Sequence, residues 1–227
     1  MSGHAAEIAE TGRIDLAVFD LDGTVTRYGT FFPYLLAMLA RRPWRLAYLP
    51  MVLPPAAGLA LGLCGHGEVK SALMRAILGG LTREELSAST ERFVAHWSHV
   101  HVLAAARAAI DAHRRAGDHL VLMSASPDLY VPALGRALGF QEIICTGVRW
   151  NGDRLDGHLS TMNCRGEQKV RCLRQLRERF PGRASAYGNS RTDIAHLKLV
   201  ERGVFVNGTA SARQAARRAG LTCVRWR

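Results

Sequence analysis

Short apolar runs alternate with longer amphipathic stretches along most of this chain. Residues 14–19 (IDLAVF), 119–126 (HLVLMSAS) and 142–146 (EIICT) have the composition of strands that are buried on both faces. ASAYGNS, which starts at residue 184, predicts a fourth strand and its loop, and VFVN, which starts at residue 204, predicts a fifth. Strands that alternate with helices form a parallel sheet with helices on both faces. We therefore predict an α/β fold with a Rossmann-like sheet.

Three helices and one hairpin are predicted between these strands. Residues 102–117 end on Gly117, a residue type that commonly closes a helix. Residues 166–180 carry apolar side chains at helical spacing, and a further helix is predicted from residue 192. Within residues 148–160, the pair Asn151-Gly152 lies between alternating residues, which predicts a β-hairpin.

One long segment interrupts the alternation of strands and helices. Residues 28–98 follow the first strand and have an almost entirely helical pattern, whereas a first strand-to-helix connection normally spans a few residues. We therefore predict an inserted all-helical cap at 28–98, above the C-terminal edge of the sheet. The core then comprises residues 13–27 and 99–227, and residues 1–12 are expected to be a flexible tail.

The composition is ordinary for a globular protein, but the charge is not. Apolar residues make up 48% and charged residues 22%, which is typical of a folded domain. The net charge of +11 favours an anionic partner, which could be nucleic acid, a membrane surface or a phosphorylated substrate. The five cysteines form no C-x-x-C pair, so we expect neither a disulfide framework nor a zinc site, and a cytoplasmic location.

Polar and charged side chains follow the predicted strands. In open α/β sheets, ligands bind beyond the carboxyl ends of the strands, so these side chains should share one edge. A lysine near the start of the helix at 166–180 should join them. The set consists of three carboxylates, an amide, a hydroxyl and an ammonium, from Asp20, Asp22, Asp193, Asn189, Ser124 and Lys169.

This set of side chains suits metal-assisted phosphoryl transfer. Mg²⁺ prefers hard oxygen ligands, and a carboxylate can attack phosphorus to give an aspartyl-phosphate. Lys169, Ser124 and the amides of the loop 20–24 could hold the phosphoryl oxygens. Asp22 is placed to act as the general acid and base. A divalent cation between Asp20 and Asp22 would explain why two like charges lie so close together.

Four sequence motifs resemble those of the haloacid dehalogenase superfamily of phosphatases. They are DLDGTVT, SAS, GEQK and GNSRTD, and in this order they span residues 16 to about 207. The helical insertion directly after the first motif resembles the cap of the phosphoserine-phosphatase-like branch, subfamily IB. The resemblance implies a Mg²⁺-dependent phosphatase.

The resemblance also implies a role for each motif residue. Asp20 is the nucleophile and a metal ligand, and Asp22 is the acid and base, with its backbone carbonyl toward the metal. Asn189 and Asp193 complete the metal shell. Phosphate contacts are assigned to Gly23, Thr24, Ser124, Ala125 and Lys169. The fourth motif usually opens with aspartate, so Asn189 removes a negative charge and should lower the metal affinity.

The cap should select the substrate, and one part of it is unusually apolar. Residues 46–64 (LAYLPMVLPPAAGLALGLC) carry no charge and follow Arg41, Arg42 and Arg45. The length approaches a membrane span, but three prolines make a straight spanning helix improbable. Two interpretations remain open: a bent helical hairpin that dips into an anionic membrane surface, or helices that bury these residues against each other.

The substrate prediction follows from this cap. Phosphoserine phosphatases carry a glutamate shortly after the first motif, whereas residues 27–36 (RYGTFFPYLL) have no acid. The cap and the TMNC segment are similar to the lipid phosphatases of the phosphatidylglycerophosphatase C type. We therefore favour a lipid phosphate such as phosphatidylglycerophosphate as the substrate, and a cytoplasmic protein at the inner face of the membrane.

Two alternatives remain open beside the lipid-phosphate prediction. The protein could be a soluble small-metabolite phosphatase of the phosphoserine type, or a catalytically weak module that binds phosphate or lipid. Nucleic acid is not expected as a partner, because no nucleic-acid motif accompanies the basic side of the helix at 166–180.

Overall fold

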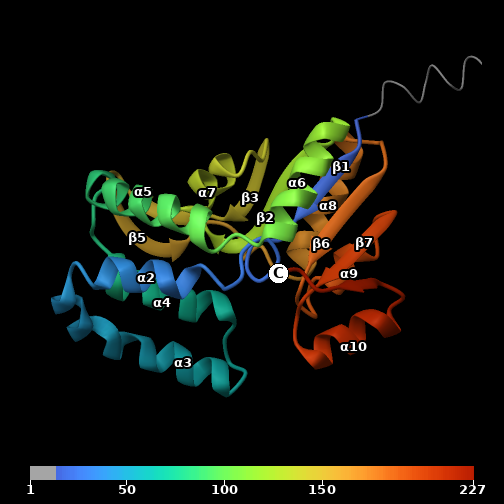
Figure 1. The fold of residues 1–227 in the computed structure, drawn as a ribbon. Coiled ribbons are helices and arrows are strands. Elements are labelled where there is room, and N and C mark those ends of the chain that lie inside the picture. The colour runs from blue at the N-terminus through green and yellow to red at the C-terminus, as the bar shows by residue number, and fades with distance from the viewer. Residues whose placement is uncertain (1–13) are drawn as a thin grey trace, which may run out of the picture.

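A six-stranded parallel sheet forms the centre of the protein, whose computed structural model describes residues 14–227 (Figure 1). The strand order is β3-β2-β1-β6-β7-β8, and every neighbouring pair is parallel. The bounds are β1 Leu16–Phe19, β2 His119–Pro127, β3 Glu142–Thr146, β6 Ala184–Gly188, β7 Arg202–Val206 and β8 Thr222–Val224. The predicted Rossmann-like α/β fold is therefore confirmed. The tail expected at residues 1–12 lies outside the described residues.

The central strand β1 is buried on both faces, as its continuous apolar run predicts. Leu16 and Val18 belong to one hydrophobic cluster, and Ala17 and Phe19 belong to the cluster on the other face. β1 pairs with β2 on one side and with β6 on the other, so the order of the strands reverses there. Ligands of open α/β sheets bind at such a point, beyond the carboxyl end of the strand. In this chain, that position is occupied by Asp20.

Helices cover both faces of the sheet, and three of the five lie in predicted segments. The bounds are α6 Ala104–Ala116, α7 Val131–Ala137, α8 Glu167–Arg179, α9 Ile194–Leu197 and α10 Ala210–Arg218. Gly117 closes α6 in the left-handed region, with φ of 82°. The helix predicted from residue 192 is wrong in length, because α9 has only four residues.

Three elements have no counterpart in the prediction: α7, α10 and β8. The α10 helix does carry a start signal, because the Thr209 side chain accepts a hydrogen bond from the Ala212 amide. Its buried face consists of small alanines, Ala212 and Ala216, and these contribute little to an apolar pattern. The strand β8 spans only three residues at the edge of the sheet, which is too short for an alternation to be recognised.

The insertion after β1 is helical, as predicted, and forms the left part of Figure 1. Its elements are α2 Phe31–Leu39, the 3₁₀ helix η1 Pro43–Val52, α3 Leu53–Ala60, α4 His66–Leu78 and α5 Arg83–Val100. Prolines interrupt the apolar segment 46–64, as expected. Within residues 14–227, no helix is both long enough and apolar enough to cross a membrane.

The apolar segment is not buried inside the cap. None of the residues of η1 or α3 is fully buried, and only a few, such as Leu49 and Val52, pack partly against the hydrophobic core, so the segment is covered incompletely. Trp44, Leu61 and Leu63 are 63%, 73% and 79% exposed. The cap therefore presents an unpartnered apolar surface.

A β-hairpin from later in the chain packs against the cap. Gly152 and Asp153 join the strands β4 Val148–Asn151 and β5 Arg154–Leu159, so the predicted hairpin is present and its turn lies one residue later than the Asn151-Gly152 pair. Leu155 exchanges backbone hydrogen bonds with the α4–α5 connection, because its carbonyl accepts from Gly80 at 2.8 Å and its amide donates to Leu81 at 2.9 Å. Gly157 allows this approach, since a Cβ there would lie only 2.9 Å from the backbone nitrogen of Arg75 and would clash with it.

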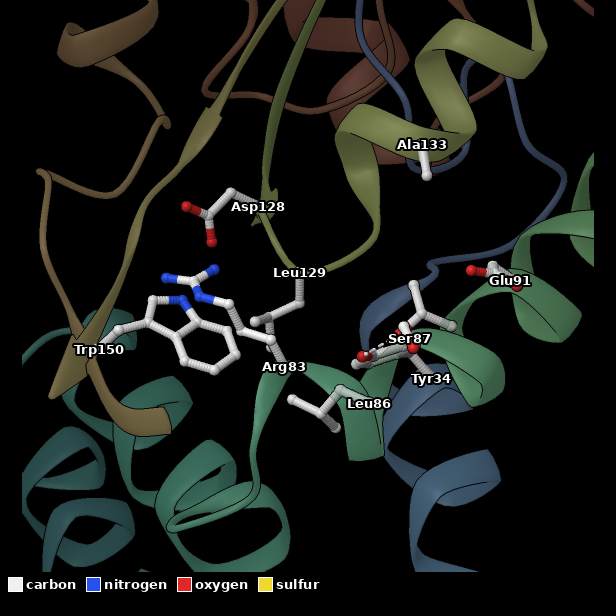
Figure 2. Close-up of a pocket in the computed structure, with 10 residues that line it drawn as sticks. Tyr34, Arg83, Leu86, Ser87, Glu91, Asp128, Leu129, Ala133 and Trp150 are labelled. Atoms are coloured by element: carbon white, nitrogen blue, oxygen red, sulfur yellow. Dashed lines mark hydrogen bonds between the residues drawn. The ribbon is translucent and has the colours of Figure 1, made fainter. Parts of the chain in front are cut away.

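Aromatic and charged side chains join the hairpin to the cap and the core. The Arg83 guanidinium lies 3.9 Å from the centre of the Trp150 ring, and in Figure 2 it lies between this ring and Asp128. These side chains border a cavity of about 290 Å³ between α5, β4 and the loop after β2. The hairpin thus contacts the cap as well as the core, to which the predicted division of the chain assigns residues 148–160. The predicted domain boundaries themselves stay a prediction.

Candidate active site

A cavity of about 340 Å³ lies at the carboxyl ends of β1 and β6, beneath the cap. It brings together six of the residues singled out in the sequence, together with Thr30, Lys70, Ser126 and Arg165. The six are Asp20, Asp22, Ala125, Lys169, Asn189 and Asp193. Gly23, Thr24 and Ser124 do not line this cavity, although they were predicted to contact phosphate.

Asp20 directly follows β1 and is buried. Its Oδ1 accepts a hydrogen bond from Lys169 Nζ at 2.6 Å, and its Oδ2 accepts one from Thr24 Oγ1 at 3.0 Å. Burial raises the pKa of Asp20 to about 7, although the Lys169 ammonium acts in the opposite direction. Two hydrogen-bond donors thus fix the Asp20 carboxylate at the cavity. Because burial disfavours its negative charge, a further positive charge nearby would stabilise the ionised form.

Lys169 lies between two carboxylates. Besides Asp20, its Nζ contacts Asp193 Oδ1 at 2.9 Å, and the lysine is only 2% exposed. Burial opposes its charge, but Asp20 and Asp193 outweigh this effect and raise the pKa of Lys169. Burial likewise opposes the charge of Asp193, but Lys169 holds the pKa of Asp193 well below its usual range. Helix α8 therefore delivers a permanent cation to the floor of the cavity.

Asp193 organises the loop after β6. Its Oδ2 accepts hydrogen bonds from the amides of Asn189 and Ser190, at 3.2 and 2.9 Å, and from Ser190 Oγ at 2.7 Å. Its other oxygen contacts Lys169. One oxygen of Asp193 therefore fixes the loop after β6, and the other meets Lys169 at the cavity. The place predicted for Asp193 in the metal shell stays a prediction.

Asp22 connects the first motif to the beginning of the cap. Its Oδ1 accepts hydrogen bonds from the amide and hydroxyl of Thr30, at 2.6 and 2.7 Å. Its Oδ2 accepts one from Ser126 Oγ at 2.7 Å. The Thr30 hydroxyl also lies 2.9 Å from the buried Tyr130 hydroxyl. The carboxyl group of Asp22 is therefore held at the junction of cap and core.

The three predicted residues outside the cavity have structural contacts. Gly23 adopts φ of +81°, and a Cβ there would lie 2.0 Å from Asn189 Nδ2, so the loop and Asn189 meet only because residue 23 is glycine. The Thr24 amide donates to the Leu21 carbonyl at 3.3 Å, so it is engaged in the turn. Ser124 is fully buried, and its Oγ accepts the Ser126 amide at 3.0 Å.

Several residues that line the cavity were not singled out in the sequence, among them Ser126, Arg165 and Lys70. Ser126 is the second serine of the SAS motif, and its hydroxyl reaches the cavity where Ser124 does not. Arg165 lies four residues before the motif lysine, so proximity to the motif was the available signal. Lys70 comes from cap helix α4, about 50 residues after Asp20, and no motif marks it.

The carboxylate and amide groups at the cavity suit a magnesium ion as ligands. No group of three or more His, Cys, Asp or Glu side chains converges on one point within residues 14–227. Asp20 and Asn189 nevertheless bring a carboxylate and a side-chain amide to the same cavity. Hard oxygen ligands of this kind suit Mg²⁺, which keeps several waters and needs few protein ligands. Asp20, Asn189 and the Asp22 backbone carbonyl are the groups that could hold it.

The fold and this arrangement of side chains define an α/β enzyme in which a cap covers a buried aspartate–lysine–aspartate cluster at the end of the central strand. Comparison with known proteins identifies the family. The model of the haloacid dehalogenase-like hydrolases matches residues 17–198, and the chain belongs to this family. The protein is therefore a hydrolase.

Two curated relatives resemble this chain in sequence. Protein CicA of Caulobacter vibrioides is 30% identical over 187 residues, which cover 82% of this chain and 83% of CicA. Histidinol-phosphatase of Neisseria meningitidis serogroup C is 27% identical over 150 residues, which cover 63% of this chain and 68% of that protein. The similarity therefore extends over most of each protein.

Solved structures share the fold. A protein of unknown function from Bordetella pertussis superposes with a TM-score of 0.78 at 21% identity, over 93% of this chain and 98% of that chain. A probable phosphoserine phosphatase from Vibrio cholerae gives 0.71 at 14% identity, over 96% of this chain and 62% of that chain. These likenesses establish the capped Rossmann-like architecture.

Proposed function

We propose that this protein is a Mg²⁺-dependent phosphatase that hydrolyses a lipid phosphate at an anionic membrane surface, through an aspartyl-phosphate on Asp20. Phosphatase activity is supported by membership of the hydrolase family and by phosphatases among its relatives. The finer proposal rests on one observation, which is that Phe32 of the cap both lines the catalytic cavity and is exposed, in a cap that carries many exposed apolar side chains.

The residues of the cavity account for both halves of the reaction. An oxygen of Asp20 bonds to phosphorus while the bond to the leaving oxygen breaks, and Asp22 donates a proton to that oxygen. Water then attacks the aspartyl-phosphate, Asp22 accepts its proton, and the bond between Asp20 and phosphorus breaks. Lys169 holds Asp20 in place and offsets the negative charge of the phosphoryl group. Mg²⁺, when bound, supplies further positive charge at the phosphoryl oxygens.

Apolar side chains lead from the cavity onto the surface of the cap. Phe31 and Phe32 line the cavity, and Phe32 is also 63% exposed. Within residues 14–227, ten of the 14 exposed large hydrophobic side chains lie between residues 28 and 63. Scattered exposed apolar residues are normal, but such a concentration marks an interaction site. A lipid with its phosphate in the cavity would place its acyl chains along this surface.

Basic side chains at the same surface favour an anionic membrane. Arg41 is exposed, and Arg45 is half-buried and donates to the Gly79 carbonyl at 2.8 Å. Arg42 lies beside them, at the start of η1. Apolar side chains flanked by arginines are typical of segments that lie in the interface of a bilayer.

The test measures binding and turnover with vesicles that contain phosphatidylglycerol. Each basic residue near such a surface contributes about 1 kcal/mol, so replacing Arg41, Arg42 and Arg45 with glutamine should weaken binding roughly 100-fold. The matched control replaces Arg171, Arg217 and Arg218, three exposed arginines of the core, with glutamine. This control has the same net charge as the cap variant and should bind vesicles like the wild type. Hydrolysis of phosphatidylglycerophosphate in the vesicles, divided by hydrolysis of p-nitrophenyl phosphate, should fall only in the cap variant.

The alternatives make different predictions for the same experiment. A soluble phosphomonoesterase, the activity that the relatedness to histidinol-phosphatase favours, predicts that the wild type stays in the supernatant at low salt. That result would overturn the membrane proposal and leave the phosphatase proposal intact. A catalytically weak binding module predicts no Mg²⁺-dependent release of phosphate from any substrate, which would overturn both.

A further inference from the structure

Cap helix α4 places one ammonium group in the wall of the catalytic cavity. Lys70 is half-buried, and its Nζ donates to the Ala125 carbonyl at 2.6 Å and to Asn163 Oδ1 at 3.1 Å. The ammonium also lies 5.6 Å from the centre of the Phe31 ring. These contacts join three parts of the protein: the cap, the C-terminal end of β2 and the segment before α8. Lys70 is thus held in one position by the residues around the cavity.

The charges of the cavity are unevenly distributed. Lys169 is paired with Asp20 and Asp193 on the floor. Asp22 accepts its hydrogen bonds from hydroxyl and amide groups of Thr30 and Ser126, which are neutral. Lys70 and Arg165 also line the cavity, and neither forms an ion pair within the described part of the chain. Lys70 and Arg165 therefore give the cavity a second group of cations besides Lys169.

The environment keeps Lys70 charged at neutral pH. Burial lowers the pKa of Lys70 to about 8, while Asp22 opposes this effect and Arg165 adds to it. Because a pKa of about 8 still lies above 7, most Lys70 side chains carry a proton there. One further donor hydrogen of the ammonium remains beside the two that Ala125 and Asn163 accept.

We propose that Lys70 binds an anionic group of the leaving part of the substrate, so that the site prefers phosphomonoesters with a second negative charge near the phosphate. This inference rests on the proposed phosphatase function and deepens it. The three aspartates of the cavity are engaged with Lys169 or with neutral donors, so no acidic side chain of the cavity is placed to receive an amine. A cationic leaving group would meet Lys70 and Arg165 and be repelled.

The chemistry recognised by Lys70 is a carboxylate or a phosphodiester within a few bonds of the scissile phosphate. The test has one arm with soluble compounds, for a carboxylate, and one arm with lipid vesicles, for a phosphodiester. The soluble arm compares 3-phosphoglycerate, glycerol 3-phosphate and phosphoethanolamine, whose leaving groups are anionic, neutral and cationic. The vesicle arm compares phosphatidylglycerophosphate, which carries a phosphodiester, with phosphatidic acid, which carries no second anionic group.

The measured quantity is the ratio of kcat/KM between the anionic and the neutral substrate in each arm. Wild type should favour the anionic substrate at least tenfold, and Lys70→Met should reduce that ratio by about tenfold or more, since charged hydrogen bonds are worth this much. Lys70→Arg should keep most of the preference because the charge remains. The matched control is Arg75→Met, which removes an exposed cation from the same helix and should leave the ratio unchanged.

Two results would overturn the proposal. The first is an equal loss of kcat/KM on all substrates in Lys70→Met, which would assign the lysine a structural role in holding Ala125 and Asn163. The second is a wild type that prefers the neutral or cationic substrate in both arms.

A binding measurement separates this inference from the proposed function. Calorimetric titration of the same compounds into Asp20→Asn, and into Asp20→Asn with Lys70→Met, reports the preference without turnover. If the wild type hydrolyses none of the substrates, the proposed function fails, while the binding ratio still decides the role of Lys70. Equal affinity for anionic and neutral compounds in Asp20→Asn would exclude that role.

Discussion

Replacement of Lys169 by methionine tests the charge arrangement at the floor of the site. The lysine is 2% exposed and lies 2.6 Å from an oxygen of Asp20 and 2.9 Å from an oxygen of Asp193. Methionine is similar in length but carries no charge, so Lys169→Met leaves two buried carboxylates without their cation. Without the lysine, these two buried negative charges should destabilise the folded protein.

The size of the effect follows from the burial. Removing one partner of a buried ion pair costs about 3–5 kcal/mol, because the remaining charge is uncompensated. For a chain of this length, each kcal/mol shifts Tm by about 2–4 °C, so Tm should fall by roughly 6–20 °C. Substituting Asp20 and Asp193 by asparagine in the same variant removes both stranded charges. This triple variant should recover most of the lost stability and remain inactive.

The assay is urea unfolding at pH 7 in the presence of EDTA, so that no divalent cation compensates for the carboxylates. Arg179→Met is the matched control, because Arg179 is exposed and forms an ion pair with Glu142 at the surface. This control should change the free energy of unfolding much less than Lys169→Met. A loss below about 1 kcal/mol in Lys169→Met would refute the reasoning. So would a triple variant that is no more stable than the single one.

Four further predictions concern catalysis. Asp20→Asn should stay folded and lose nearly all hydrolysis; activity within tenfold of wild type, about 1.4 kcal/mol in the barrier, would exclude Asp20 as the nucleophile. Asp22→Asn should lower kcat at similar KM, and less for nitrophenyl than for alkyl phosphates, whereas equal losses would contradict the acid role. Asn189→Asp should lower the half-saturating Mg²⁺ concentration, and an unchanged value would place Asn189 outside the metal shell. The preference for anionic leaving groups should decline as pH rises through about 8, because Lys70 then loses its proton; a preference that is constant up to pH 10 would contradict this.

Much of the core could be predicted because its signals are local. The run Leu16–Phe19 is apolar at every position, since alternate residues enter the two clusters on opposite faces of the sheet. Asn151-Gly152 predicts the hairpin because that pair suits a tight turn between strands. Asp20, Lys169 and Asp193 follow or flank such elements, so the architecture of parallel strands brings them to one edge.

The weaker elements had weaker local signals. The helix α9 ends after four residues, although the sequence from residue 192 continues with helix-forming residues. The edge strand β8 and the alanine-rich face of α10 contribute few large apolar side chains, so their patterns could not be separated from loop. In these places, packing against the sheet decides the structure and propensity does not.

The sequence by itself determined the α/β class, the helical insertion and the cluster at the end of β1, because apolar periodicity and motif residues act over a few positions. Tertiary structure alone decided which side chains share the cavity. It turned Ser126 toward the cavity and buried Ser124, it placed the hairpin on the cap, and it brought Lys70 beside Ala125 across more than 50 residues. It also left the segment 46–64 exposed, although its composition suited burial equally well. Such contacts depend on how whole elements pack, and no local pattern encodes that packing.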